Sequence, residues 1–355
     1  MNFKKRFFEL FIIIVLVFIS LELSIRAFLY KKDNFLFQSN TQYLFYKENI
    51  KKLHHLRDVV GNNKVFKNPE KFLFTKIIDN KENKKLILFQ GDSRTRQLDE
   101  FQKSNLILKG TSYNLINGGS TSFSPSMMSV QFDILSEEYN YKPNIIVALI
   151  DPTDLGDELC RYKNNIVIVD EHIKKIEPTH SKNQYYFYQN LFLMSEIKFF
   201  PGPKILKSHK IIKHYLKYNL GSKKGPCRYR EIQNYLMNIK KDEIEYFNKI
   251  LNLYLKNLIK NEFVNKVYLV LYPHVQHLEY EKFKILYKYK LNEIISVNLD
   301  KNKDKVEIID YYNNDIFDGY KKNYNKIFIE NDNASHLTSK GIEVFYDNIF
   351  KDIKF

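Results

Sequence analysis

A serine and a histidine lie near opposite ends of the sequence in settings suited to acyl chemistry. Ser93 follows Gly91 and Asp92, which come directly after the apolar run at residues 85–90. A serine hydroxyl is a poor nucleophile until a base takes its proton, and histidine suits that task near neutral pH. His336 differs from the other histidines because it stands in a polar loop directly before a closing helical segment. Gly-Asp-Ser is also an ordinary turn sequence, so the site depends on a fold that joins the two side chains.

The elements that must position this pair alternate between apolar runs of strand length and segments with helical spacing. Ligands of open α/β sheets gather outside the carboxyl ends of the strands, which is where Ser93 falls. The pattern predicts an α/β fold with a doubly wound, flavodoxin-like parallel sheet of about five strands flanked by helices. The expected strands are Lys85–Gln90, Tyr113–Asn117, Asn144–Ile150, Lys266–Leu271 and Val306–Asp310, and the expected helices are Met127–Tyr139, residues 244–258 and Leu337–Phe350.

The N-terminus predicts a membrane anchor. Lys4, Lys5 and Arg6 precede residues 7–30, a mostly apolar stretch of bilayer-spanning length. No good small-residue cleavage site follows it, which favours an uncleaved signal anchor over a secretory signal peptide. A buried helix of a soluble protein is the alternative. With the anchor, residues 1–30 comprise a cytoplasmic tip and a transmembrane helix, and the bulk of the chain lies outside.

The remaining chain divides into a spacer and one domain. Residues 31–84 are polar, aromatic and lysine-rich without a sustained period, and we expect there a juxtamembrane spacer that ends by packing on the domain. Residues 85–355 form the predicted α/β domain, with a helical insertion at about 160–240 that contains a basic amphipathic helix. Cys160 and Cys227 could form one disulfide or remain two free thiols.

The charge of the chain narrows the expected partners. A formal net charge of +15 favours an anionic neighbour such as a membrane surface or an acidic glycan. The lysines are spread along the chain without a zinc-finger spacing or a nucleic-acid motif, so we expect no nucleic-acid partner.

The order of four short motifs resembles that of the SGNH (GDSL) hydrolases, over about residues 85–350. The motifs are Gly91-Asp92-Ser93 after the first strand, Asn117-Gly118-Gly119 after the second, Asp151-Pro152-Thr153-Asp154 after the third and the His336 loop. The resemblance implies that Ser93 is the nucleophile. It also implies an oxyanion hole made by the amide of Ser93, by Gly119 or alternatively Gly118, and by Thr153, which replaces the family's asparagine.

The family's acid lies three residues before the histidine, and that position holds Asn333. Asp332 is one residue earlier, and we favour it as the acid that supports His336. A Ser-His dyad and an impaired site are the other possibilities.

The remaining charged residues near these motifs have supporting roles or none. Asp92 and Asp154 are expected to support the loops. Arg94 or Arg96 could bind an anionic group of the substrate or pair with surface carboxylates. The acidic cluster near Asp157 lacks a recognisable ion-binding loop, so we expect no metal and no other cofactor.

An exported, membrane-tethered domain of this type resembles bacterial enzymes that move or remove acetyl groups on cell-surface polysaccharides. The resemblance implies a serine esterase or O-acetyltransferase whose partners are an acylated glycan or sugar acceptor and, through residues 7–30, the lipid bilayer. It places a single-pass protein in the inner membrane with its domain facing the periplasm or the cell exterior. The alternatives are a catalytically impaired binding or assembly component of an envelope glycan system, and a lipid esterase.

Overall fold

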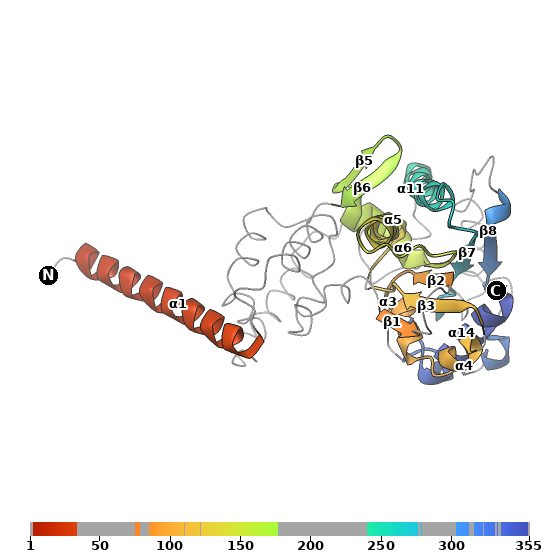
Figure 1. Ribbon diagram of the computed structural model, residues 1–355, viewed down its shortest axis with the longest axis horizontal. Helices are drawn as coiled ribbons and strands as arrows, with labels where there is room; N and C mark the ends of the chain where they lie inside the picture. The colour runs from red at the N-terminus through yellow and green to blue at the C-terminus, as the bar shows by residue number, and fades with distance from the viewer. Residues whose placement is uncertain are drawn as a thin grey trace. The chain divides into compact units, whose positions relative to one another are not determined.

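The structure is a computed structural model in which two compact units can be described (Figure 1). The first contains α1 (Phe3–Asp33), and the second contains all the other elements. The described residues are 3–33, 75–78, 85–109, 111–120, 122–176, 240–275, 278, 303–311, 316–321, 323–330, 332 and 335–353.

The second unit is built on a six-stranded, mostly parallel sheet with the order β1-β3-β2-β4-β7-β8. Five strands are parallel, and β1 pairs with β3 in the antiparallel sense. In chain order the five parallel strands are arranged 2-1-3-4-5, which is the flavodoxin-like order. The predicted α/β class and parallel sheet are therefore confirmed. The strands are β1 (Thr75–Ile78), β2 (Lys85–Gln90), β3 (Tyr113–Asn117), β4 (Ile145–Ile150), β7 (Lys266–Leu271) and β8 (Val306–Asp310).

Helices cover both faces of this sheet, which explains why its central strands are continuously apolar. On one face, alternate side chains of β2 such as Ile87 and Phe89 pack with residues of α14 (Ser339–Asp352). On the other face, the Gln90 side chain donates to the Met128 carbonyl of α5 (Pro125–Asp133) and accepts from Tyr254 of α11 (Lys241–Ile259). Figure 1 shows α5 and α11 together on one side of the sheet and α14 on the other.

Short helical turns connect these elements. They include 3₁₀ turns and two π-helical turns, each of which continues an α-helix. The α-helical segments are α3 (Ser93–Arg96), α4 (Ser104–Leu108) and α6 (Pro152–Asp157); the π turns are η5 (Ile134–Glu138) and η6 (Glu158–Tyr162); the 3₁₀ turns are η4 (Gln97–Glu100), η8 (Lys303–Lys305), η9 (Asp318–Tyr320) and η10 (Tyr324–Lys326).

Two strand regions differ from the sequence pattern. β1, near the end of the stretch that is expected to be a spacer packing on the domain at its end, is a strand that extends the sheet beyond β3. The expected helical insertion begins with an antiparallel hairpin, β5 (Ile166–Val169) and β6 (His172–Ile176), because its β-branched run favours strand pairing. Residues 177–239, where the basic amphipathic helix is expected and where Cys227 lies, are outside the described residues.

The first unit presents many apolar side chains to its surroundings. Along α1, the large apolar side chains from Phe7 to Leu21 are mostly exposed; Phe7 is 65% exposed and Leu16 59%. Among the described residues, no helix has both the length and the apolar character that crossing a bilayer requires.

Candidate active site

Ser93 lies at the carboxyl end of β2, beside the centre of the sheet. Gly91 ends the strand with a φ of +148°, and a Cβ there would lie 2.2 Å from the Thr95 hydroxyl oxygen. Only glycine fits this turn without strain. Asp92 then caps α3 by accepting a hydrogen bond of 2.8 Å from the Arg94 N–H. Ser93 is therefore the first residue of a short helix that begins at the edge of the sheet where ligands gather.

His336 lies in the segment that leads into α14. Its carbonyl accepts a hydrogen bond of 2.9 Å from the Ile329 N–H, and the neighbouring Leu337 forms an antiparallel bridge with Phe328. Thr338 caps α14 by accepting from the Gly341 N–H at 3.2 Å, as its sequence position predicts. The histidine loop is thus held between a backbone bridge and the start of a helix.

The structure brings Ser93, His336 and Asp332 into one hydrogen-bonded chain. Ser93 Oγ lies 2.7 Å from His336 Nε2, although 243 positions separate the two residues. On the other side of the ring, His336 Nδ1 lies 2.6 Å from Asp332 Oδ2. The same carboxylate oxygen accepts the His336 backbone N–H at 2.8 Å.

A tight turn explains how Asp332 reaches the ring from four residues away. The Ser335 N–H bonds to the Asp332 carbonyl at 3.0 Å, and Ser335 adopts a positive φ of 53°. This turn folds the loop back so that the carboxylate faces His336. Asn333 lies outside the described residues.

The arrangement fixes the protonation pattern of the imidazole. A carboxylate at Nδ1 holds the ring proton there, so Nε2 is left to accept the hydrogen of the Ser93 hydroxyl. The Asp332 and His336 side chains are 23% and 28% exposed, so the pair borders solvent while its hydrogen bonds are partly shielded. Chemically, this chain of contacts can activate a serine oxygen for attack on an acyl carbonyl.

The oxyanion donors expected from the second motif are engaged inside the protein. The Gly119 N–H donates to Asn117 Oδ1 at 2.9 Å, and the Gly118 N–H donates to the Phe89 carbonyl at 2.7 Å. Gly119 nevertheless lies against the serine helix, because a Cβ on it would lie 2.3 Å from the Arg96 nitrogen. The other candidate donors to an oxyanion are the Ser93 amide and Thr153 of the third motif.

Thr153 lies in the first turn of α6, where Asp151 is the N-cap. The Asp154 carboxylate accepts the Asp151 N–H at 2.9 Å and so closes a capping box that fixes this turn. The Thr153 hydroxyl oxygen is 3.4 Å from the Arg94 guanidinium, which can donate to it. A hydroxyl that accepts from a cation keeps its own hydrogen for another acceptor.

Arg94 links the first and third motifs from inside the protein. It is 1% exposed and forms ion pairs with both Asp92 and Asp151, while its guanidinium lies 5.1 Å from the centre of the Tyr272 ring. Burial, the largest single effect, lowers its pKa, but Asp92 together with Tyr272 and Asp154 more than offsets this, so the pKa lies above its usual range. Arg94 therefore pairs with carboxylates, as one sequence alternative predicts, although these are buried. Arg96 is exposed.

A second group of buried acids lies along α6 and η6. Burial raises the pKa of Asp154 and Asp157 well above the usual range, and the negative charge of Asp92 adds to this effect. Burial also raises the pKa of Glu158 to about 7, against the opposing effect of hydrogen bonds from Ser124 and Ser126. No group of three or more ligating side chains suited to a metal occurs in the part of the chain that the structure describes.

Two residues near the site carry no marked signal in the sequence. The Tyr272 hydroxyl donates to the Ser335 carbonyl at 2.8 Å, so it supports the histidine loop while its ring faces Arg94. Its position just after a buried strand is the one signal that could have found it. Gln97, at the start of the turn η4 that follows the serine helix, contacts the same loop through Leu337, and nothing in its local sequence indicates that contact.

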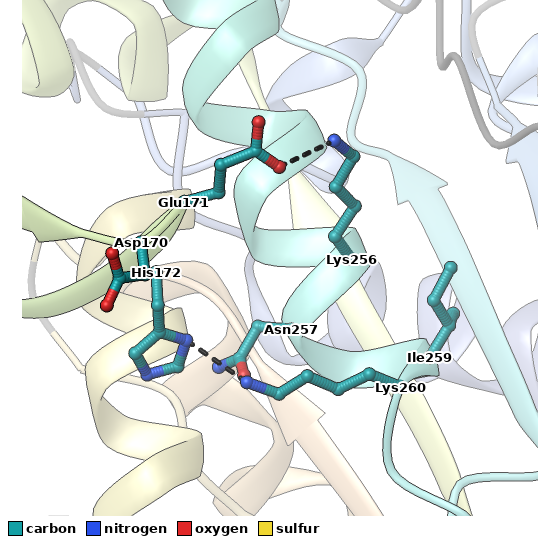
Figure 2. Close-up of a pocket in the computed structure, with 7 residues that line it drawn as sticks. All are labelled: Asp170, Glu171, His172, Lys256, Asn257, Ile259 and Lys260. Atoms are coloured by element: carbon teal, nitrogen blue, oxygen red, sulfur yellow. Dashed lines mark hydrogen bonds and ion pairs between the residues drawn. The ribbon is translucent and has the colours of Figure 1, made fainter.

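A cavity of about 350 Å³ lies apart from these residues, between the β5–β6 hairpin and the end of α11. Figure 2 shows the charged side chains that line it, with Glu171 paired to Lys256 and His172 facing Lys260. The other nitrogen of His172 lies 2.8 Å from Asp133. None of the residues expected to do chemistry lines this cavity.

The fold and site together define an α/β protein with a hydrogen-bonded serine, histidine and aspartate at the carboxyl edge of a parallel sheet. No protein-family model matches the chain, and no curated protein matches it either. Among solved structures, the chain is similar to one described as "a putative platelet activating factor from Streptococcus pneumonia", with a TM-score of 0.36 and 13% identity. The match covers 88% of this chain and 99% of that one.

Proposed function

We propose that this protein is an SGNH-type serine esterase or O-acyltransferase that works through an acyl-serine intermediate. The observation that carries the proposal is the chain of two short contacts, 2.7 Å from Ser93 to His336 and 2.6 Å from His336 to Asp332. Three side chains in this order perform nucleophilic acyl transfer on several unrelated folds.

The reaction proceeds in two halves. As Ser93 Oγ attacks the acyl carbonyl, its proton moves to His336 Nε2, and Asp332 stabilises the imidazolium that forms. The imidazolium gives the proton to the departing alkoxide, which leaves as an alcohol. The acyl group stays on Ser93 as an acyl-serine. Water or a sugar hydroxyl then gives its proton to His336 and attacks the acyl group, and the proton finally returns to Ser93. Hydrolysis and transfer differ only in which hydroxyl reaches the intermediate.

The oxyanion of the tetrahedral intermediate needs hydrogen-bond donors close to Ser93. The serine amide lies in the first turn of α3, where backbone N–H groups lack intrahelical acceptors. The Thr153 hydroxyl can add a donor while it accepts from Arg94. Gly119 contributes only if its N–H exchanges the Asn117 oxygen for the substrate oxygen, because the two acceptors compete for one hydrogen.

The finer assignment is a membrane-tethered enzyme that acts on acylated cell-surface glycan outside the bacterial inner membrane. It is supported by Lys4, Lys5 and Arg6 at the start of α1 and by the exposed apolar side chains that follow them along that helix. The net charge of +15 would favour association with an anionic surface. The bilayer and a sugar acceptor or acylated glycan are the proposed partners.

The test is covalent labelling of the full-length protein with a fluorophosphonate, together with turnover of an aryl acetate. Ser93→Ala should abolish both signals and His336→Ala should reduce both, because each removes one half of the contact. Ser112→Ala, a change at an exposed serine, should leave both signals intact. Acyl transfer to an added oligosaccharide, followed by mass spectrometry, separates transferase from esterase. Labelling that survives Ser93→Ala would contradict the proposed nucleophile.

A binding or assembly component is the second candidate, and one observation favours it. Both glycine N–H groups of the second motif already have acceptors within the protein, which leaves fewer donors for an oxyanion. A folded sample that takes up no fluorophosphonate and turns over no ester, yet binds envelope glycan, would favour this candidate.

A further inference from the structure

The backbone beside His336 is held on two sides. On one side, the Thr338 N–H donates to the Ile327 carbonyl at 2.8 Å and the Ile329 N–H donates to the His336 carbonyl at 2.9 Å. These two bonds flank Leu337 and pair it with Phe328 as neighbouring strands would. The peptide groups of Leu337 itself point away from this bridge, as alternation along an extended chain requires.

Gln97 occupies the other side of Leu337. Its Nε2 donates to the Leu337 carbonyl at 2.8 Å, and its Oε1 accepts the Leu337 N–H at 3.0 Å. Both hydrogen bonds are buried, and Gln97 is 9% exposed. One side-chain amide thus satisfies both backbone polar groups of Leu337, as the backbone of an adjacent strand would.

Gln97 is also fixed to the helix that carries the serine. It comes four residues after Ser93, begins the 3₁₀ turn η4, and its backbone N–H bonds back to the Arg94 carbonyl. Its side chain reaches across 240 positions of sequence to the residue that follows His336. The Gln97 side chain therefore links the helix that carries Ser93 to the loop that carries His336.

We propose that Gln97 is a positioning residue that sets the approach of His336 Nε2 to Ser93 Oγ. This inference rests on the proposed function of that pair. Without the Gln97 amide, the N–H and the carbonyl of Leu337 both lose their buried partners. The loop that carries His336 then moves to recover hydrogen bonds from solvent. A displacement of about 1 Å between reacting groups costs on the order of 100-fold in rate.

The test compares Gln97→Met with Asn144→Leu in the full-length protein. Methionine keeps the length of the glutamine side chain and makes neither hydrogen bond. Asn144 is a matched amide, because its side chain accepts from the Leu86 N–H at 3.0 Å and donates to the Phe263 carbonyl at 3.1 Å, just before β4 begins. It bridges two backbone segments away from the serine.

We expect the two variants to differ in kcat, and we expect Gln97→Met to change kcat much more than KM. Gln97→Met should lower kcat for an aryl acetate by about 100-fold with KM changed less than about threefold, since it disturbs the reacting groups and not the binding surface. Asn144→Leu should lower the melting temperature and leave kcat of the folded fraction within about threefold. Equal effects of the two variants on kcat would overturn the inference.

A spectroscopic measurement separates this inference from the proposed function. The proton between His336 Nδ1 and Asp332 should give a downfield NMR resonance, which Asp332→Asn assigns by removing it. Gln97→Met should broaden or abolish this resonance, and Asn144→Leu should keep it. If the unmodified chain hydrolyses no ester, the proposed function fails. The NMR resonance then tests by itself whether Gln97 positions His336. A resonance that stays sharp in Gln97→Met overturns the positioning role.

Discussion

Glu158 should make the protein less stable as the pH rises, and replacing it with glutamine should remove that loss. The carboxyl is fully buried, and its Oε1 accepts hydrogen bonds of 2.7 Å from the Ser124 hydroxyl and the Ser126 N–H. Glutamine keeps an oxygen for these donors but cannot ionise. Glu158→Gln therefore changes the charge of the site with little change in shape.

The magnitude follows from the pKa of this group. Burial raises the pKa of Glu158 from 4.5 to about 7, so the folded protein holds the proton more tightly than the unfolded chain does. The stability that this proton contributes is complete below pH 4.5 and is lost as the pH rises through 7. The full difference is about 3 kcal/mol, an upper value because buried sites relax when they ionise.

Urea unfolding followed by circular dichroism at pH 5 and pH 8 tests this, since the chain contains no tryptophan to report by fluorescence. Glu158→Gln should resemble the unmodified protein at pH 5 and exceed its stability by about 2 to 3 kcal/mol at pH 8. Glu245→Gln, a change at an exposed glutamate of α11, should show no such difference between the two pH values. An advantage of Glu158→Gln that is equal at both pH values would refute the reasoning.

Two further changes test the serine site and its support. Asp332→Asn should lower kcat for an aryl acetate by about 10⁴-fold, because an amide at this position no longer holds the proton on His336 Nδ1. Stopped-flow or end-point assays of ester hydrolysis would measure this loss, and a loss under tenfold would point to a working Ser-His dyad. Arg94→Met should destabilise the fold by about 3 to 5 kcal/mol in urea unfolding, because two aspartates are left buried without their cation, and an unchanged midpoint would contradict their pairing.

The parallel strands could be predicted because both of their faces are buried. A run such as that of β4, in which every residue from Ile145 to Ile150 is buried, has no polar face to interrupt it. The edge strand β1 has no such run, and its pairing with β3 depends on tertiary contacts that a short sequence window does not contain.

The predicted site residues differ in how much of their environment the sequence can specify. Ser93 and His336 stand next to recognisable element ends, so their meeting follows from the order of strands and helices. The reach of Asp332 depends on the positive φ of Ser335, a conformation that no local rule assigns to a serine. Gln97 finds its partner 240 residues away, and the burial of Arg94 depends on Asp151, the N-cap of α6.

The distance along the chain between Ser93 and His336 has a consequence for biosynthesis. Ser93 leaves the ribosome long before His336, and the histidine loop is held in place by α14, which follows it. Domains fold as units once their residues have emerged, so a nascent or prematurely ended chain carries the serine without its proton acceptor. If the pair acts as proposed, such a chain would be unable to acylate itself or attack neighbouring esters until the histidine loop and α14 have folded onto the sheet.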